Sequence, residues 1–455
     1  MTPFQYLKKT EKQRQRDLFE FLRFPSVSAK SEHKKDMIAC ARWLTRHLKG
    51  IGFKARTMLT GGHPVVYAEY KADGNAPTVL YYGHYDVQPP EPLNLWQSAP
   101  FKPVVRKGYI YARGACDDKG QVFAQIKGLQ AVLETTGTLP INVRLLIEGE
   151  EETASENLPR FIRKNKKLLK SDIAVVSDTS QFSKTLPAVT FGLRGIAFVE
   201  LFVYGPDRDV HSGGFGGTIA NPVNVLCDMV GQLHDKNGKI AIPGFYRDVK
   251  PVSQWQRRQF KKLPFNETAY KKSLRVPALH GEKGYTTMER CWARPTLDIN
   301  GIAGGYQGEG GKTIIPAMAS CKITMRLVPD MDPKDICNKI EKHLKKIAPK
   351  SVRVKVIKHG GGRAVMIPTD GPWLGAAARA VKTGFGKTPV FMREGGSIPV
   401  VADFKSILGI DTLLIGLGQN DDNVHSPNER FRIIDFERGC RTAAALPVEL
   451  AGVKR

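Results

Sequence analysis

The sequence predicts an α/β protein, in which a mostly parallel sheet is covered by helices on both faces and a smaller α+β domain is inserted. Short apolar, β-branched runs alternate with amphipathic helical stretches in the first part of the chain. The same alternation returns near the end of the chain, whereas the region between them follows a different order. Alternating strands and helices favour parallel pairing with helices on both faces, and this observation gives the fold class.

The elements of the larger domain can be placed in order along the chain. A helix is expected at 36–49, because Met37, Ala41, Leu44 and Leu48 recur at helical spacing before glycines end it. The elements that follow are strands at 65–70, 78–82, 141–147 and 173–176 and helices at 121–134 and 157–169. The last part adds a helix at 373–383, a strand at 412–416 and a helix from about 434.

The central region reads as strand, helix, strands and helix, without the regular alternation. Its expected elements are a strand at 196–204, a helix at 222–233, strands at 296–301 and 320–327 and a Lys-rich helix at 333–347. This order is typical of a small α+β domain. We therefore expect a domain at 194–362, inserted between the two parts of the larger domain at 1–193 and 363–455.

The charge balance is the one unusual bulk property of the chain. Lys and Arg number 69 against 44 Asp and Glu, which gives a formal net charge of +25. A nucleic-acid or other anionic partner must be considered. The basic residues are spread over amphipathic segments such as 163–170 and 334–350, and no recognisable DNA- or RNA-binding motif is present. We therefore interpret the charge as solvated basic faces and expect no specific nucleic-acid partner.

Hydropathy and cysteine usage indicate the compartment. No apolar run approaches the roughly 20 residues of a membrane span, and the first 24 residues are charged and helix-like. The seven cysteines are odd in number, scattered and never in C-x-x-C spacing. This pattern favours reduced thiols and argues against a cysteine-bound zinc site. A cytoplasmic protein without a membrane partner is expected.

Several predicted strands end in acidic or histidine residues, which is the most informative feature of the sequence. These residues are His84, Asp86, Glu148, Glu151, Glu152 and Asp178, and the loop after the strand at 412–416 leads to His425. Sites of open α/β sheets form beyond the carboxyl ends of the strands. The side chains are therefore expected to converge there.

Converging carboxylates and imidazoles must be neutralised, and a divalent metal does this economically. A lone histidine or aspartate at a strand end is usually a surface or capping group, but several together favour a site. Two histidines with several acids and no suitable thiols favour two metal ions with open positions, zinc first and manganese as the alternative. A further pair, Asp117 and Asp118, precedes the helix at 121–134 between glycines, where a turn with a helix N-cap is the other interpretation.

Four ordered motifs resemble a known family of enzymes. They are HYDVQP at 84–89, GACDDKG at 114–120, EGEEE at 148–152 and VHSPNE at 424–429. They are similar to the co-catalytic zinc peptidases, which include carnosine and cysteinylglycine dipeptidases, aminoacylases, carboxypeptidase G and succinyl-diaminopimelate desuccinylase. The resemblance covers nearly the whole chain and implies the zinc peptidase fold, with the larger domain as the catalytic domain.

The resemblance implies a role for each residue that matches a motif. Asp117 would bridge two metal ions in each subunit, with His84 and Asp178 completing one metal position. Glu152 and His425 would complete the other position.

Two further roles follow from the same resemblance. Asp86 would hold the His84 ring from behind and fix its tautomer. Glu151, adjacent to a ligand, would be the general base, whereas Cys116 occupies a variable slot and is interpreted as packing.

The inserted domain resembles the lid and dimerisation domain of the carnosine-type dipeptidase branch. The stretch 262–295 is also similar to the lid of that branch. His211 in DVHSGG matches a lid histidine that reaches the active site of the partner subunit, which implies a homodimer. Arg326 in ITMRLVP would grip a substrate carboxylate, and Thr313 and Ser397 would also contact substrate. The alternatives are a structural ion pair for Arg326 and turn positions for Thr313 and Ser397.

The expected function is hydrolysis of the amide bond of dipeptides with a free C-terminal carboxylate. A hydroxide shared by the two metals would attack the carbonyl, and Glu151 would carry the proton to the leaving amine. An N-acyl or N-carbamoyl amino acid amidohydrolase of the same fold would use identical catalytic residues, so the ligand set leaves that alternative open. A basic binding protein that retains an inactive peptidase fold is disfavoured by the complete ligand set.

Overall fold

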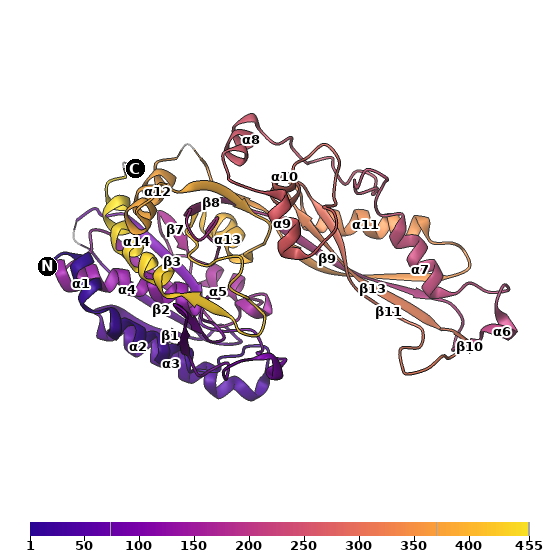
Figure 1. Cartoon of the computed structure of the whole chain (residues 1–455), viewed down its shortest axis with the longest axis horizontal. Coiled ribbons are helices and arrows are strands. Elements are labelled where there is room, and N and C mark those ends of the chain that lie inside the picture. The colour runs from indigo at the N-terminus through magenta and orange to yellow at the C-terminus, as the bar shows by residue number, and fades with distance from the viewer. Residues whose placement is uncertain (73, 370, 454–455) are drawn as a thin grey trace. The chain divides into compact units, whose positions relative to one another are not determined.

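The computed structural model describes residues 1–72, 74–369 and 371–453. The chain forms two compact units (Figure 1). Unit 1 consists of Met1–Phe191, Ile367–Met392 and Pro399–Arg455, and unit 2 consists of Gly192–Met366 with Arg393–Ile398. The short segment of unit 2 lies in the predicted second part of the larger domain. It belongs to unit 2 because Ser397 Oγ donates to the Arg194 carbonyl and Arg194 Nε donates to the Gly395 carbonyl.

Unit 1 is built on a large sheet whose centre is parallel. In spatial order its strands are β1 (Lys54–Met58), β2 (Val65–Tyr70), β6 (Asn142–Glu148), β3 (Thr78–His84), β7 (Ile173–Val176), β17 (Thr412–Leu414) and β8 (Ala188–Leu193), with β16 (Val390–Glu394) also paired to β8. β3 pairs in parallel with β6 and β7, and β17 pairs in parallel with β7. The pairs β1–β2, β2–β6 and β17–β8 are antiparallel. The predicted parallel arrangement therefore describes the centre of the sheet, whereas its flanks are antiparallel.

Helices cover both faces of this sheet (Figure 1). One face carries α2 (Glu11–Leu22), α3 (Lys34–Gly50), α4 (Lys119–Thr136) and α14 (Ile433–Ala451), with α1 (Pro3–Lys9) and α12 (Pro372–Phe385) packed beside them. The other face carries α5 (Leu158–Lys164), α13 (Pro399–Asp403) and the short helix η4 (Phe404–Leu408). Adjacent residues of β3 show the two faces: a Cβ on Gly83 would clash with Val122 of α4, whereas Tyr82 packs edge-on against Phe404. The predicted α/β class is confirmed.

A small sheet of β18 (Arg430–Arg432), β5 (Tyr109–Tyr111) and β4 (Val104–Arg106) completes unit 1. The predicted elements of this unit are present, and the helix predicted at 157–169 is shorter, as α5 ends at Lys164. The Asn165 side chain donates to the Phe161 carbonyl and its backbone N–H donates to the Phe161 and Ile162 carbonyls, which caps the helix end. The strands β1, β4, β5, β8, β16 and β18 were not predicted.

Unit 2 contains a four-stranded antiparallel sheet in the order β11 (Thr296–Gly304), β13 (Met318–Leu327), β9 (Gly195–Tyr204) and β14 (Arg353–Gly362). Alternate residues of β9 are buried, and they form a core with α7 (Pro222–Gly231) and α11 (Pro333–Ile347). Short helices α8 (Gln254–Lys261), α9 (Glu267–Leu274) and α10 (Thr287–Trp292), which were not predicted, lie between α7 and β11 in the chain.

A two-stranded ribbon extends this unit. β10 (Val210–His211) pairs with β12 (Ile314–Ile315), and the single turn α6 (Ser212–Phe215) follows β10. A last short strand, β15 (Val365–Met366), pairs with Gly192 and Leu193 at the end of β8. Among the described residues no helix has the length and apolar character needed to cross a membrane.

Candidate metal centre

The carboxyl ends of neighbouring parallel strands meet at one edge of the unit 1 sheet. β3 ends at His84, which is paired with Glu148 at the end of β6. β7 is paired with β3 up to Tyr82, and Asp178 follows its last residue by two positions. The register thus brings the ends of three strands side by side, and their terminal side chains share one region.

Asp117, in the loop before α4, lies between two histidines. Its Oδ1 is 3.1 Å from His84 Nε2, and its Oδ2 is 2.9 Å from His425 Nε2. Glu152 Oε2 lies 3.3 Å from the same His425 nitrogen. His425 has a backbone φ of 63°, which is uncommon for a residue other than glycine. Each of the two imidazoles therefore faces a different oxygen of Asp117, as expected for a carboxylate that bridges two ions.

Two sets of three side chains place ligand atoms within 4.8 Å of one another. One set is His84, Asp117 and Glu152, and the other is His84, Asp118 and Asp178. Asp118 was not predicted as a ligand, although the paired aspartates in GACDDKG were the available signal. Its carboxylate accepts a hydrogen bond from the His84 backbone N–H at 3.3 Å. Gly83 makes this approach feasible, because a Cβ there would lie 2.6 Å from Asp118 Oδ2.

Asp86 contacts one predicted ligand of each metal position. Its Oδ1 lies 3.4 Å from His84 Nδ1, and its backbone carbonyl is 3.0 Å from the same nitrogen. Its Oδ2 accepts a hydrogen bond from the Glu152 backbone N–H at 3.1 Å. Gln88, of the same HYDVQP motif, donates to Glu152 Oε2 at 2.7 Å and was not predicted as a site residue. Asp86 and Gln88 therefore orient side chains that the ions would bind.

Crowding of buried carboxylates raises their affinity for protons. Burial raises the pKa of Asp118 and of Asp178 well above the usual range, and neighbouring carboxylates add to both shifts. Burial likewise raises the pKa of Glu151 to about 7, with Asp117 and Glu152 adding to the shift. Positive charge beside these buried carboxylates would stabilise their ionised form. Bound cations would supply that charge in place of the protons.

Asp117 departs from this pattern because it has two imidazole partners. Burial opposes its ionisation, but hydrogen bonds from His425 and His84 hold the pKa of Asp117 below its usual range. Hydrogen bonds to Asp117 and Glu152 in turn raise the pKa of His425 to about 10. In each histidine the ring nitrogen that faces Asp117 is the one that would face an ion.

The donor set fits two divalent ions bound through nitrogen and oxygen. Imidazole nitrogens and carboxylate oxygens suit zinc and manganese. The nearby thiol of Cys116 instead lies 3.5 Å from Asp422 Oδ2 and is in neither ligand set. Glu151, which opens the short helix η3 (Glu151–Thr153), also lies outside both sets. The residues present therefore fit a two-metal centre.

Four predicted site residues lie in unit 2, in two places. Arg326 Nη1 donates to Ser397 Oγ at 3.1 Å, so these two candidate substrate contacts lie together. His211 and Thr313 lie on the β10–β12 ribbon, where both are exposed, and the Thr313 carbonyl accepts from the Ser212 N–H at 3.0 Å. The His211 ring accepts a hydrogen bond from the Gly213 N–H at 2.9 Å through Nδ1.

The two places lie at opposite ends of β13. The ribbon precedes Met318, where β13 begins, whereas Arg326 lies eight residues further along the same strand. A strand advances about 3.3 Å per residue, so roughly 26 Å of sheet separates the ribbon from Arg326. His211 and Arg326 of one chain therefore cannot contact the same dipeptide.

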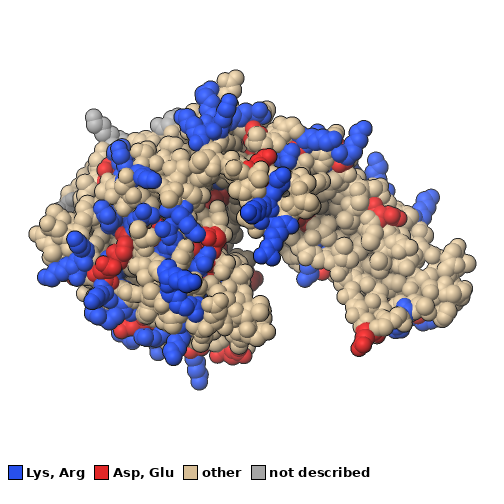
Figure 2. Space-filling model, viewed as in Figure 1, with Lys and Arg blue, Asp and Glu red and all other residues tan. Residues whose placement is uncertain are grey.

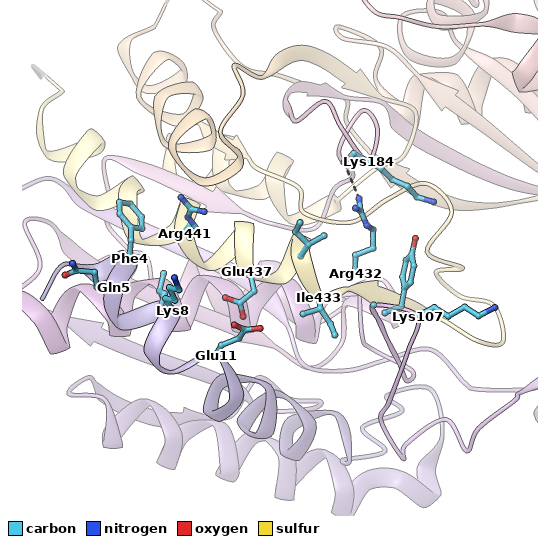
Figure 3. A pocket seen from close by; sticks show the side chains of 14 residues that line it. Phe4, Gln5, Lys8, Glu11, Lys107, Lys184, Arg432, Ile433, Glu437 and Arg441 are labelled. Atoms are coloured by element: carbon cyan, nitrogen blue, oxygen red, sulfur yellow. Dashed lines mark hydrogen bonds between the residues drawn. The ribbon is translucent and has the colours of Figure 1, made fainter.

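Surface charge and a cavity in unit 1 lie apart from the strand-end cluster. Figure 2 shows Lys and Arg scattered over the visible face, with Asp and Glu among them. A cavity of about 900 Å³ lies against α1 and the start of α14, lined in part by Phe4, Lys8, Arg432 and Arg441 (Figure 3). None of its lining residues is a predicted site residue. The chemistry is therefore assigned from the side chains at the strand ends.

Comparisons with known proteins agree with the geometry. The sequence profile of peptidase family M20/M25/M40 matches residues 80–449. The chain is 34% identical over 441 residues to the Cys-Gly metallodipeptidase DUG1 of Candida albicans, covering 92% of this chain and 90% of the relative. It is 33% identical over 400 residues to the human Beta-Ala-His dipeptidase, covering 85% and 78% of the two chains.

A solved structure extends the comparison to the whole fold. The crystal structure of the M20 family metallo-carboxypeptidase Sso-CP2 from Sulfolobus solfataricus matches with a TM-score of 0.88 at 32% identity, over 96% of this chain and 99% of that one. The resemblance based on the four motifs is thereby confirmed. With this agreement in profile, sequence and structure, the chain belongs to peptidase family M20/M25/M40 and is a metallopeptidase, a hydrolase that acts on peptide bonds.

Proposed function

We propose that this protein is a dipeptidase that hydrolyses the amide bond of dipeptides with a free C-terminal carboxylate. The observation that carries the proposal is the pair of ligand sets that share His84, with Asp117 between His84 and His425. Relatives named for Cys-Gly and Beta-Ala-His dipeptides support the substrate class. His84, Asp117, Glu152, Asp178 and His425 would hold two divalent ions, with Asp118 as an additional ligand candidate.

Bound ions of this kind lower the pKa of water and polarise a carbonyl. Glu151 adjoins the ligand Glu152 and belongs to neither ligand set, and its carboxylate would take the proton of the attacking water. The same carboxyl then delivers this proton to the amine that leaves. Asp86 keeps His84 Nε2 directed at the centre through its contacts with Nδ1.

Arg326 and Ser397 would recognise the C-terminal carboxylate of the substrate. The guanidinium can bind a carboxylate through two parallel hydrogen bonds, and its contact with Ser397 Oγ orients it. Thr313 lies with His211 on the β10–β12 ribbon, far from Arg326, so it remains a candidate contact only for the site of the partner subunit. This assignment explains a requirement for a free C-terminus, because an amide would present a donor where an acceptor is needed.

We further propose that the active unit is a homodimer in which His211 completes the site of the partner subunit. The separation of His211 from Arg326 along β13 supports the proposal, since one chain cannot bring both to one small substrate. Unit 2 would then serve as the lid and dimerisation domain. A site supplied by two chains also agrees with the exposure of His211.

The dimer proposal can be tested by mixing two inactive variants. His211→Ala and Glu151→Gln should each be nearly inactive alone. A mixed dimer retains one site with both residues, and random exchange makes about half of the dimers mixed, so activity should recover to about a quarter of wild type. If light scattering and tagged subunits show exchange but no activity returns, His211 does not act across the interface.

Zinc is the proposed metal, with manganese as the alternative, and the cytoplasm is the proposed location. The nitrogen and oxygen donors support the choice of metal. The seven cysteines are all free thiols, which supports a reducing compartment.

The substrate class is tested with chelated enzyme to which zinc or manganese is added back. The panel contains free-amine dipeptides, tripeptides, dipeptide amides, and N-acetyl and N-carbamoyl amino acids. We expect dipeptides with a free carboxylate to be cleaved and their amides to be poor substrates. Faster cleavage of N-acyl or N-carbamoyl amino acids than of any dipeptide would contradict the proposal.

A second activity is favoured by one comparison. The relative from Sulfolobus solfataricus is described as a metallo-carboxypeptidase, and the match covers 96% of this chain. Recognition of a C-terminal carboxylate by Arg326 serves a carboxypeptidase equally well. The tripeptides of the panel separate the two activities, because release of the C-terminal amino acid at the dipeptide rate would favour the carboxypeptidase.

A further inference from the structure

Glu429, the last residue of the VHSPNE motif, is completely buried and holds the loop that carries Asp117. Its Oε2 accepts hydrogen bonds from Arg113 Nη1 at 2.9 Å and from the Gly114 N–H at 2.8 Å. Its Oε1 accepts from the Cys116 N–H at 2.9 Å and from the Asp117 N–H at 3.1 Å. One carboxylate therefore binds four donors of a single loop, including the backbone of the predicted bridging ligand.

Other contacts hold the same loop in place. The Glu429 backbone carbonyl accepts from the Ala112 N–H at 3.2 Å. The other terminal nitrogen of Arg113 donates to the Pro89 carbonyl at 3.1 Å. Gly120 allows the start of α4 to close onto the loop, because a Cβ there would lie 1.9 Å from the Ala115 carbonyl oxygen. The loop therefore has little freedom to shift while these bonds remain.

We propose that Glu429 is a positioning residue of the metal centre, which acts by fixing the backbone of Asp117 so that its two oxygens reach both ions. The inference rests on the proposed two-metal function. Glu429 belongs to neither ligand set, so it would act only through Asp117. Because Asp117 faces both His84 at 3.1 Å and His425 at 2.9 Å, a shift of its backbone changes both contacts at once.

The hydrogen-bond chemistry specifies a carboxylate at this position. All four partners are donors, and an ionised carboxylate offers acceptors only. An amide of the same size turns one oxygen into an NH₂ group. In either orientation of the amide, two of the four donors face another donor and lose their partner. Glu429→Gln should therefore loosen the loop without removing bulk.

Asp435→Asn provides a matched control in the same unit. Asp435 is also completely buried and accepts hydrogen bonds from Arg432, Arg438 and Gln419. Among the described residues, no hydrogen bond or ion pair joins Asp435 to the loop at 112–117. The control therefore reports what a buried carboxylate-to-amide change does to stability when the Asp117 loop is left alone.

The test measures zinc affinity directly, by competition between the metal-free protein and a chromophoric chelator, with thermal unfolding measured in parallel. We expect both variants to unfold at lower temperature. Glu429→Gln should weaken zinc binding by about 10–100-fold, the usual effect of losing an outer partner of a metal ligand, whereas Asp435→Asn should stay within about 2-fold of wild type. The cobalt form of Glu429→Gln should also show an altered visible absorption spectrum.

Folded Glu429→Gln with wild-type zinc affinity would overturn the proposal, as would an equal loss of affinity in Asp435→Asn. If Glu429→Gln does not fold, Glu429→Asp is measured instead; it keeps the charge but is too short to bond all four donors, and the same weakening is expected. Failure of both to fold while Asp435→Asn folds would reject positioning in favour of a fold role. Wild-type protein that binds no metal would contradict the proposed function instead.

Discussion

The two units differ in how deeply they bury their candidate site residues. In unit 1 His84 and Asp118 are completely buried and Asp117 and Glu152 are half-buried, while His425 is the exposed member of the group. In unit 2 the candidate substrate contacts are exposed or half-buried, as His211 and Arg326 show. Groups that hold an ion permanently can be buried, because the ion offsets the loss of hydration. Groups that meet a substrate and release it must stay accessible to solvent.

Sheet architecture accounts for the difference. The parallel centre of the unit 1 sheet directs the carboxyl ends of β3, β6 and β7 to one edge, where several side chains converge. The antiparallel sheet of unit 2 sends alternate strand ends in opposite directions, so His211 and Arg326 are held far apart. One unit is thus suited to assembling a centre, and the other to presenting separate groups.

The largest effect is expected from Asp117→Ala, which removes the carboxylate shared by the two histidines. Both ions should be lost together after desalting, with activity below detection, as measured by elemental analysis and dipeptide assay. Asp421→Ala, which removes an exposed carboxylate paired with Lys184, is the control and should keep both ions. If Asp117→Ala retained two tightly bound ions, the bridge would lie elsewhere, with Asp118 as the next residue to test.

Glu151→Gln should retain both ions and lose turnover by roughly 10²–10⁴-fold, because it removes the proton acceptor and no ligand. Metal content and kcat on the best dipeptide of the panel are the measurements. Glu156→Gln changes an exposed glutamate a few residues away and should be unaffected. A wild-type kcat in metal-loaded Glu151→Gln would show that another group carries the proton.

Arg326→Lys should reduce kcat/KM by about 10–100-fold, mostly through KM, because Lys cannot bind a carboxylate with a bidentate fork. Metal content should not change. A dipeptide amide should be a poor substrate for the wild-type protein and lose little more in the variant. Equal losses for the dipeptide and its amide would indicate that Arg326 is structural and acts through Ser397.

The smallest effect concerns stability alone and tests the interior of unit 1 away from the ligands. The His47 ring stacks on Trp43 and contacts Phe123, and burial lowers the pKa of His47 to about 4. Well above pH 6.5 the ring is neutral in the folded and unfolded chains and contributes no pH dependence. As the pH falls from about 6.5 to 4, the unfolded chain takes up a proton that the folded chain excludes, so stability is lost.

His47→Phe keeps an aromatic ring and removes this titration. The free energy of unfolding, measured in urea at pH 7.5 and 4.5, should fall less in the variant than in wild type, by roughly 2–3 kcal/mol. Catalysis at neutral pH should be unchanged. An identical fall in both proteins would show that the folded state accommodates protonated His47.

Much of the fold could be predicted because its elements have clear periodic patterns. The strands at 65–70 and 173–176 and the helix at 333–347 agree with β2, β7 and α11. The antiparallel flanks were missed, since pairing direction depends on which strands become neighbours. β14 was missed although its first residues alternate basic with β-branched side chains, as in a half-buried strand, because it ends in three glycines, which have low strand propensity.

The sequence by itself determined which residues could bind metal, because acids and histidines at strand ends are a local feature of ordered motifs. Only the tertiary structure brought residue 117 next to residue 425, and only it showed that the neighbouring carboxylates of Asp117 and Asp118 enter different ligand sets. It also joined Glu429 to the loop at 113–117, more than 300 residues away. Local patterns encode residue type and periodicity, whereas distances between remote segments arise only when the whole core packs.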